Sequence, residues 1–294
     1  MPTSDSCKRE APPPAGRPTR RLGHRDDGEE RGPRPGPSTG GEPHAAVAGG
    51  PAPPAASGTV GKLAGNVVFL PDHRADLDPD LAAVSDGSQS LTNAQLLHRV
   101  RSASRHLKDL GVRPGDVVAL KLANRVEFVI LLFAVWRLGA AITPINPSLT
   151  DVEVDRQLAD SGARLLVAED GAPAHDGVAI LAVGGLRLAL GWPDLLPPPE
   201  PSALALLTYT SGTAGPAKGM MLDHANLDAM AAMGRDALEL GPADRCLLIL
   251  PLFHVDAIVV SVLTPLLAGA SVVIIDQFDP RTFFDGSSAS GRLS

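Results

Sequence analysis

Apolar positions along the chain alternate between two periods from about residue 78 onward. Runs of five to seven mostly apolar residues, rich in Val, Leu and Ile, predict strands, and longer segments with apolar residues at intervals of three and four predict helices. The predicted strands are 117–122, 140–146, 164–169, 203–209, 245–250 and 271–275. The predicted helices follow Thr92, Asn124 and Thr150, end at Gly111, Gly139 and Gly162, and continue with 222–240 and 256–267.

Helix starts are marked by a recurring pair of polar residues. A Thr or Asn followed three residues later by Glu or Gln predicts a capping box, in which each residue bonds the backbone of the other. The pairs are Thr92 with Gln95, Asn124 with Glu127 and Thr150 with Glu153. Asp256 is predicted to be the N-cap of the last helix, because Asp accepts hydrogen bonds from free N–H groups.

The order of elements predicts an α/β fold. Short apolar strands that alternate with helices form layered mixed or parallel sheets flanked by helices on both faces. The stretch "AAVSDGSQSL" predicts a hairpin around Asp86-Gly87. A Gly/Pro-rich stretch after residue 169 and "LLPPPEPS" (195–202) are predicted to be loops.

Composition separates the N-terminal region from the rest. Residues 1–58 contain 12 prolines, 10 glycines and almost no large apolar side chains, so they are predicted to be a disordered tail. The remainder has 18 Lys and Arg against 26 Asp and Glu, a net charge of −8. An acidic domain without a basic cluster argues against nucleic acid as a partner.

The cysteine content and the hydropathy pattern bear on disulfides, metal sites and membrane spans. Only Cys7 and Cys246 are present, which predicts no disulfide framework, and no metal-ligand spacing occurs. Residues 257–275 carry no charge, yet Pro265 and the strand-like "SVVII" favour a buried helix followed by a buried strand over a membrane span. With no apolar secretory region at the N-terminus, we expect a cytoplasmic protein.

One loop carries the chemistry. Residues 210–219, "TSGTAGPAKG", follow a predicted strand and precede a predicted helix. Glycines allow a backbone to approach an anion, hydroxyls donate hydrogen bonds and a lysine ammonium neutralises charge, so the loop suits phosphate. It fits neither the Walker A nor the G-x-G-x-x-G dinucleotide pattern. Read from these residues alone, a surface turn remains an open alternative.

The loop and its surroundings resemble the adenylate-forming enzymes, the superfamily of acyl-CoA synthetases, luciferases and peptide-synthetase adenylation domains. "YTSGTAGPAKGMMLDHANL" is similar to their phosphate-binding signature, including His224, Asn226 and Leu227, although Ala214 replaces a threonine and Pro216-Ala217 inverts the usual order. "PLFHVDAIVVSVLTPLLAGASVVI" resembles the next motif. The resemblance implies an incomplete, large N-terminal domain of such an enzyme, with 59–284 a partial AMP-binding domain and 285–294 a non-family tail.

The resemblance implies ATP-dependent activation of a carboxylic acid as an acyl-adenylate, then transfer to a thiol such as coenzyme A. ATP, Mg²⁺ and coenzyme A are the implied cofactors, and ATP and the acid the implied partners. His254 would lie beside the carboxylate and adenylate as a catalytic residue with Lys218, and Gly219 would permit the turn. The implied nucleotide-binding residues are Thr210, Ser211, Gly212, Thr213, Gly215, Lys218 and Gly219.

Several family features have no counterpart here: the threonine–glutamate pair that supports magnesium, the ribose-binding aspartate, the hinge and the C-terminal lid with its catalytic lysine. We therefore expect a truncated member with impaired activity, which a complementing C-terminal half would restore. Two alternatives stay open. The chain is a fragment of an amino-acid adenylation domain, or a non-catalytic remnant that binds a partner.

Overall fold

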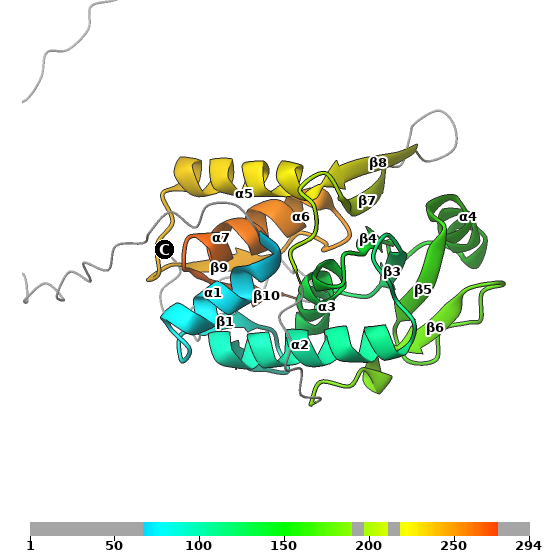
Figure 1. The fold of residues 1–294 in the computed structure, drawn as a ribbon, viewed down its shortest axis with the longest axis horizontal. Helices are drawn as coiled ribbons and strands as arrows, with labels where there is room; N and C mark the ends of the chain where they lie inside the picture. Colours follow the sequence, from blue (N-terminus) through cyan, green and yellow to red (C-terminus); the bar gives the residue numbers. More distant parts are fainter. Residues whose placement is uncertain (1–66, 190–196, 211–217, 276–294) are drawn as a thin grey trace, which may run out of the picture. The chain divides into compact units, whose positions relative to one another are not determined.

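The computed structural model describes residues 67–189, 197–210 and 218–275, all of them within the compact unit Gly58–Ser294 (Figure 1). The predicted disordered tail 1–58 and the predicted non-family tail 285–294 lie outside the described residues.

The helices and strands confirm the alternating pattern. The helices are α1 (Leu70–Leu77), α2 (Asn93–Asp109), α3 (Val126–Arg137), α4 (Asp151–Ser161), α5 (His224–Leu238), α6 (Val255–Ile258) and α7 (Thr264–Leu267), with a 3₁₀ turn, η1, at Val67–Phe69. The strands are β1 (Ala82–Ser85), β2 (Ser90–Thr92), β3 (Val117–Lys121), β4 (Ala141–Pro144), β5 (Ala163–Ala168), β6 (Ala179–Ala182), β7 (Leu204–Thr210), β8 (Lys218–Asp223), β9 (Arg245–Leu248) and β10 (Ser271–Ile274).

The described strands form two mixed sheets. One has the order β2-β1-β10-β9 and the other β6-β5-β3-β4-β7-β8. The predicted hairpin pairs β1 with β2 antiparallel, and β1, β10 and β9 run parallel. In the larger sheet β6 to β7 are parallel, and β8 returns antiparallel to β7. The predicted α/β class with mixed sheets is confirmed.

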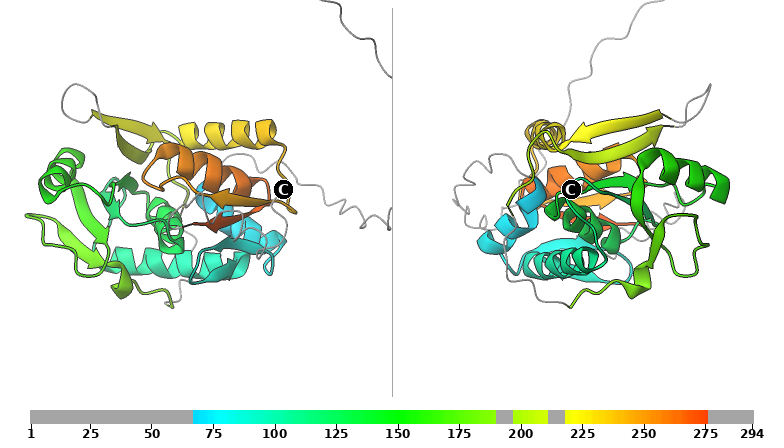
Figure 2. Two further views of the ribbon diagram at one scale, coloured as in Figure 1. Left: turned by 180° about the vertical axis from the view of Figure 1, so that it is seen from behind. Right: turned by 45° about the vertical axis from the view of Figure 1, so that its right-hand side comes forward.

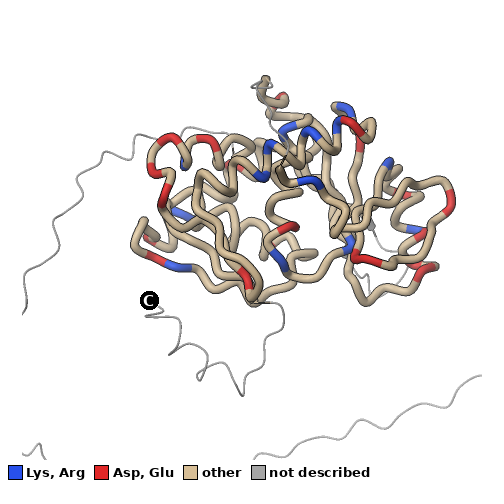
Figure 3. The backbone as a smooth tube through the Cα atoms, turned by 90° about the horizontal axis from the view of Figure 1, so that it is seen from below, with Lys and Arg blue, Asp and Glu red and all other residues tan. Residues whose placement is uncertain are grey.

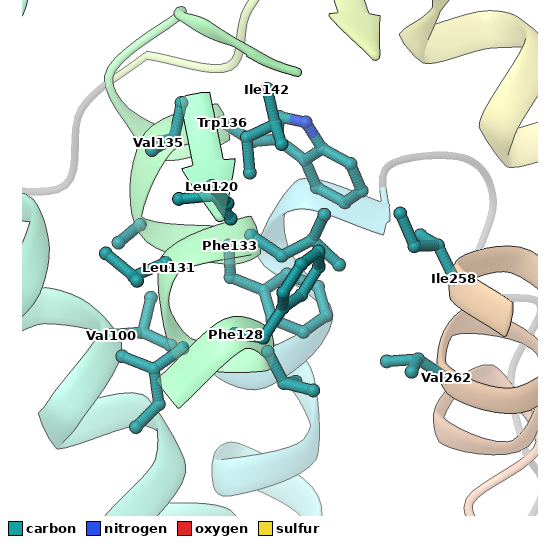
Figure 4. Packing of buried hydrophobic residues seen from close by; sticks show 14 of the residues in the cluster. Val100, Leu120, Phe128, Leu131, Phe133, Val135, Trp136, Ile142, Ile258 and Val262 are labelled. Carbon is teal, nitrogen blue, oxygen red and sulfur yellow. The ribbon is translucent and has the colours of Figure 1, made fainter. Parts of the chain in front are cut away.

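Helix α3 lies at the centre of this unit (Figures 1 and 2). All of its residues except Glu127 are buried, because its sequence is apolar all round and must be covered on every side. Figure 4 shows the aromatic side chains of Phe128, Phe133 and Trp136 directed toward Ile258 and Val262 of the helix that follows β9. The opposite side of α3 packs against α2.

The six-stranded sheet is covered on both faces. Alternate residues of β3 point to opposite sides: Val118 and Leu120 join the large core around α3. Val117 and Ala119 join a smaller core under α4, together with Leu158. This arrangement explains why the parallel strands are apolar at successive positions instead of alternating with polar residues.

Two of the predicted capping boxes are present. The Thr92 hydroxyl accepts from Gln95 N while the Gln95 side chain accepts from Thr92 N at the start of α2. At the start of α4, the Glu153 carboxylate accepts from the backbone N–H and the hydroxyl of Thr150. α4 ends at Gly162, whose left-handed φ of 61° favours glycine.

The predicted cap of α3 by Asn124 is wrong. The N-cap position is Arg125, and Asn124 instead bonds backbone groups at Leu250, Leu252 and Ile275. The first N–H of α3, that of Val126, donates to Asp86 Oδ2 of the β1–β2 hairpin at 2.9 Å. Partners distant in sequence therefore replace the local cap.

The predicted N-cap at Asp256 is also wrong, because α6 begins at Val255 and His254 is its N-cap. From α6 the chain continues through a π-helical turn, Val259–Leu263, into α7. The uncharged run 257–275 thus forms a buried helix and then the strand β10, as predicted. In the described part of the chain, none of the helices has the length and apolar character needed to cross a bilayer.

Two strands were not predicted. β6 (Ala179–Ala182) lies in the stretch predicted to be a loop and pairs along the edge of β5. β8 occupies residues predicted to be loop and helix start, so the loop is bounded by two antiparallel strands instead of a strand and a helix. Its pairing with the preceding strand β7 accounts for the error, since this pairing outweighs the local glycine-rich composition.

A buried ion pair ties α1 to α3. The Arg137 guanidinium, only 1% exposed, donates to Asp72, which also accepts from Arg101 at 2.8 Å. Burial lowers the pKa of Arg137, and the Asp72 carboxylate opposes that shift. The Arg137 group also lies 5.1 Å from the centre of the Phe69 ring. Removing Asp72 would leave a buried, unpaired charge.

Replacing Asp72 by Ala is expected to lower the free energy of unfolding by about 3–5 kcal/mol, the usual loss when one partner of a buried pair is removed. Urea unfolding of the chain measures this change. The matched control is Asp109→Ala, whose pair with Arg105 is exposed at 47% and 50% of the two side chains. That variant is expected to lose less than about 1 kcal/mol. Equal losses in the two variants would contradict the assignment.

Candidate functional site

The β7–β8 hairpin carries both ends of the glycine- and hydroxyl-rich loop. The register pairs Thr210 with Lys218, so the residues that open and close the loop are neighbours across the two strands. Ser211, Gly212, Thr213 and Gly215 lie outside the described residues.

Tyr209 anchors this end of the hairpin. Its hydroxyl donates to Asp160 Oδ2 of α4 at 2.7 Å. Desolvation first, and then the hydrogen bond and negative charge of Asp160, raise the pKa of the Tyr209 phenol. Sequence reasoning missed Asp160, since it occupies a solvent-facing position of an amphipathic helix and no local pattern distinguishes it.

Gly219 does not permit the turn, contrary to expectation. It lies within β8, paired with Tyr209, and its φ is outside the left-handed region. A Cβ atom at this position would lie 3.0 Å from Leu207 Cδ1 and 3.4 Å from Tyr209 Cε1. The missing side chain therefore makes room chiefly for the Leu207 side chain, since the Tyr209 ring would lie at an ordinary van der Waals distance.

His254 occupies the turn between β9 and α6. Its backbone N–H donates to Pro251 O at 3.0 Å, and its exposed ring lies 4.4 Å from the ring of Phe253. It follows β9 of the four-stranded sheet, whereas Thr210 and Lys218 lie in strands of the six-stranded sheet. Figures 1 and 2 show that the α6 end of its helix, and not the α7 end, is directed toward the β7–β8 hairpin.

The residues that follow the hairpin contribute to helix capping and core packing. Asp223 and Asn226 form a capping box at the start of α5, and Leu227 is fully buried. His224 is 2% exposed, and its ring meets Trp136 edge-on at 5.9 Å. Neither His224 ring nitrogen has a hydrogen-bond partner, and burial lowers its pKa to about 4. The neutral ring therefore serves as a packing surface.

A comparison of the sequence with known protein families identifies the family of this chain. Residues 71–287 match the family model described as AMP-binding enzyme. The chain belongs to the AMP-binding enzyme family. The AMP-binding match includes the β7–β8 hairpin, the loop that it closes and the turn that carries His254.

The relatives of this AMP-binding chain include several CoA ligases. It is 39% identical over 218 residues to a feruloyl-CoA synthase from Amycolatopsis sp, with 71% of this chain and 44% of the relative covered. It is 35% identical over 231 residues to an oxalate–CoA ligase from Arabidopsis thaliana, covering 70% of this chain and 45% of the relative. The chain thus spans less than half the length of these relatives.

A solved structure supports the same assignment. The inhibitor-bound N-terminal domain of FACL13 from Mycobacterium tuberculosis superposes with a TM-score of 0.70 at 28% identity, covering 77% of this chain and 61% of that one. The expected likeness to the N-terminal domain of an adenylate-forming enzyme is confirmed.

The charges of the described residues are of both signs. Figure 3 shows Lys and Arg, as well as Asp and Glu, along the whole described tube. Within residues 67–189, 197–210 and 218–275, no group of three His, Cys, Asp or Glu side chains is placed to hold a metal ion. We therefore assign no described residue to Mg²⁺.

Tyr209 provides a direct test of the hairpin anchor, because it is the single tyrosine of the chain. Its phenolate absorbance is expected to rise at a pH above the ordinary midpoint of 10.0, and Asp160→Ala is expected to lower that midpoint. Folding raises the pKa of the Tyr209 phenol, so the protonated phenol contributes to the free energy of folding. This contribution is complete below about pH 10 and is lost at higher pH. Asp155→Ala, on the same helix, is the control and should leave the midpoint unchanged.

His224 predicts a stability loss in acid. Its folded-state pKa of about 4 is below the ordinary value of 6.5, so the unfolded chain binds a proton more readily. The stability from neutral His224 is complete above about pH 6.5 and declines as the pH falls toward 4. Urea midpoints of His224→Phe should therefore vary less with pH over this interval. A pH dependence of the His224→Phe urea midpoint parallel to that of the parent would refute the assignment.

Proposed function

We propose that this chain contributes the polyphosphate-binding part of an ATP-dependent acid–thiol ligase of the acyl-CoA synthetase type. The observation that carries the proposal is the register of the β7–β8 hairpin, which pairs Thr210 with Lys218 at the two ends of the glycine-rich loop. Membership of the AMP-binding family and the CoA ligases among its relatives support the same reading.

In this proposal the loop holds the β- and γ-phosphates. Hydroxyl and backbone N–H donors bind phosphate oxygens, and the Lys218 ammonium offsets their charge. The residues assigned to this role are Thr210, Ser211, Gly212, Thr213, Gly215 and Lys218. Gly219 acts indirectly, by leaving room for the Leu207 side chain within the β7–β8 pair that closes the loop.

ATP, as substrate, supplies the adenylyl group that activates the carboxylic acid. Stabilising the charge that develops on the phosphates is the main requirement for such transfers. We assign Lys218 to that charge and His254, which is exposed at the start of α6, to the side of the acid. Coenzyme A is the proposed thiol acceptor, and Mg²⁺ the proposed counterion of the phosphates.

The chain matches only part of the length of the related ligases, and this bears on how much of the reaction it performs. The CoA ligases compared with this chain are more than twice as long as the matched stretch. We propose that this chain binds ATP but forms little acyl-adenylate by itself, and that a complementing C-terminal half restores turnover. The action would take place in the cytoplasm.

Lys218 tests the proposal. Lys218→Ala is expected to weaken MgATP binding about 10- to 150-fold, because one charge-assisted contact contributes about 1.5–3 kcal/mol. Isothermal titration calorimetry measures the affinity, and Lys121→Ala, a lysine at the end of β3, is the control. If parent and Lys218→Ala bind MgATP equally, or if neither binds it, the proposed phosphate role is wrong.

A second assay tests the reaction class. The chain is incubated with MgATP, hydroxylamine and a panel of fatty, aromatic, dicarboxylic and amino acids, with and without the C-terminal half of a related ligase. Hydroxamate from non-amino acids is expected. Hydroxamate from amino acids alone would instead assign the chain to the amino-acid adenylation branch, and ATP binding without any product would favour a binding role.

A further inference from the structure

Asn124 connects the two sheets. It lies in the loop that joins β3 to α3, and its Nδ2 donates to Leu250 O at 3.0 Å and to Ile275 O at 3.2 Å. Its Oδ1 accepts from Leu252 N at 2.8 Å. Ile275 directly follows β10, and Leu250 and Leu252 lie in the turn after β9. One side chain from the loop after β3 of the larger sheet therefore bonds the segments that follow two strands of the smaller sheet.

The chemistry of these contacts requires a carboxamide. Two carbonyl oxygens need donors and one N–H needs an acceptor, and among neutral side chains of this size a carboxamide supplies the NH₂ donors and the oxygen acceptor on one carbon. The opposite orientation of the amide would direct its oxygen at two carbonyls and its NH₂ at an N–H. The three partners therefore fix the orientation of the side chain.

The segment bonded by Asn124 leads directly to His254. Leu250 and Leu252 are held through their backbones, and the Leu252 side chain is 1% exposed in the core. The next restraint is the bond from His254 N to Pro251 O. The backbone is therefore held from residue 250 to residue 254, although the His254 ring itself is exposed.

The loop that carries Asn124 is itself restrained on both sides. Ala123 N donates to Glu169 Oε1 at 3.2 Å, and Arg125 pairs with the same carboxylate at 2.7 Å. Glu169 directly follows β5. Asn124 therefore acts from a fixed base at the carboxyl end of the larger sheet, and its bonds transmit that position to the turn of the smaller sheet.

We propose that Asn124 is a positioning residue: it holds the β9–α6 turn so that His254 has a fixed place relative to the β7–β8 hairpin. This proposal rests on the role assigned to His254 in the proposed function. The described bonds of the Asn124 side chain go to backbone groups of Leu250, Leu252 and Ile275, so it acts on His254 through the backbone of the turn.

Asn124→Ala tests the proposal in the full chain. Amide hydrogen exchange of Leu252 is expected to accelerate about tenfold or more, because the N–H loses its acceptor. The ring signals of His254, in protein labelled with ¹³C-histidine, are expected to shift, since the Phe253 ring lies 4.4 Å away and reports small displacements. His254→Gln identifies these signals among the 8 histidines.

Asn146→Ala is the matched control. Asn146 lies after β4 of the same sheet and caps only its own turn, through Ser148 N at 2.9 Å. It should leave both readouts unchanged. Asn124→Asp serves if the alanine variant does not fold: it keeps the acceptor for Leu252 N but lacks the donors to Leu250 and Ile275. It should preserve Leu252 protection and still shift His254.

The outcomes separate the two proposals. Unchanged His254 signals in a folded Asn124 variant overturn the positioning role, whatever the chain does with ATP. Shifted His254 signals support it. If those signals shift, while His254→Ala and the parent form hydroxamate at the same rate, Asn124 positions the turn and the assignment of His254 to the reaction is wrong.

Discussion

The fold depends on covering a helix that has no polar face. Eleven of the twelve residues of α3 are buried, so both sheets, α2 and the helix after β9 must pack around it before it is shielded from water. Apolar burial stabilises by about 25 cal/mol per Å² of surface, so exposing this helix would be strongly unfavourable. The indole N–H of Trp136 donates to Ala205 O of β7 at 2.8 Å. This bond sets the position of β7 against α3.

The elements that bear chemistry are attached to this core by polar contacts at its edges. The tyrosine before the loop is bonded to α4, the first N–H of α3 to the β1–β2 hairpin, and the β9–α6 turn to the loop after β3. Each contact joins segments that are far apart in sequence. The interior therefore provides rigidity, and the polar contacts at the strand ends decide where the functional segments lie.

The sequence predicted the fold well where the information is local. Apolar runs and the Asp86-Gly87 turn located eight of the ten described strands. The pattern failed at β6, which lies in a Gly/Pro-rich stretch, and at β8, where Gly219 and two exposed methionines resemble a loop. The capping signature was right at Thr92 and Thr150 and wrong at Asn124, although all three look alike along the chain. At Asn124 the partners are 126 to 151 residues away, and no local pattern could reveal them.

The π-helical turn at Val259–Leu263 joins two segments with different requirements. α6 begins directly after His254, whereas α7 packs beneath α5 and leads into β10. Each residue added to a helical turn rotates everything downstream by about 100°. A wide turn between the two segments therefore allows α6 to be oriented by the turn that carries His254 and α7 by its packing against α5, within one continuous helix.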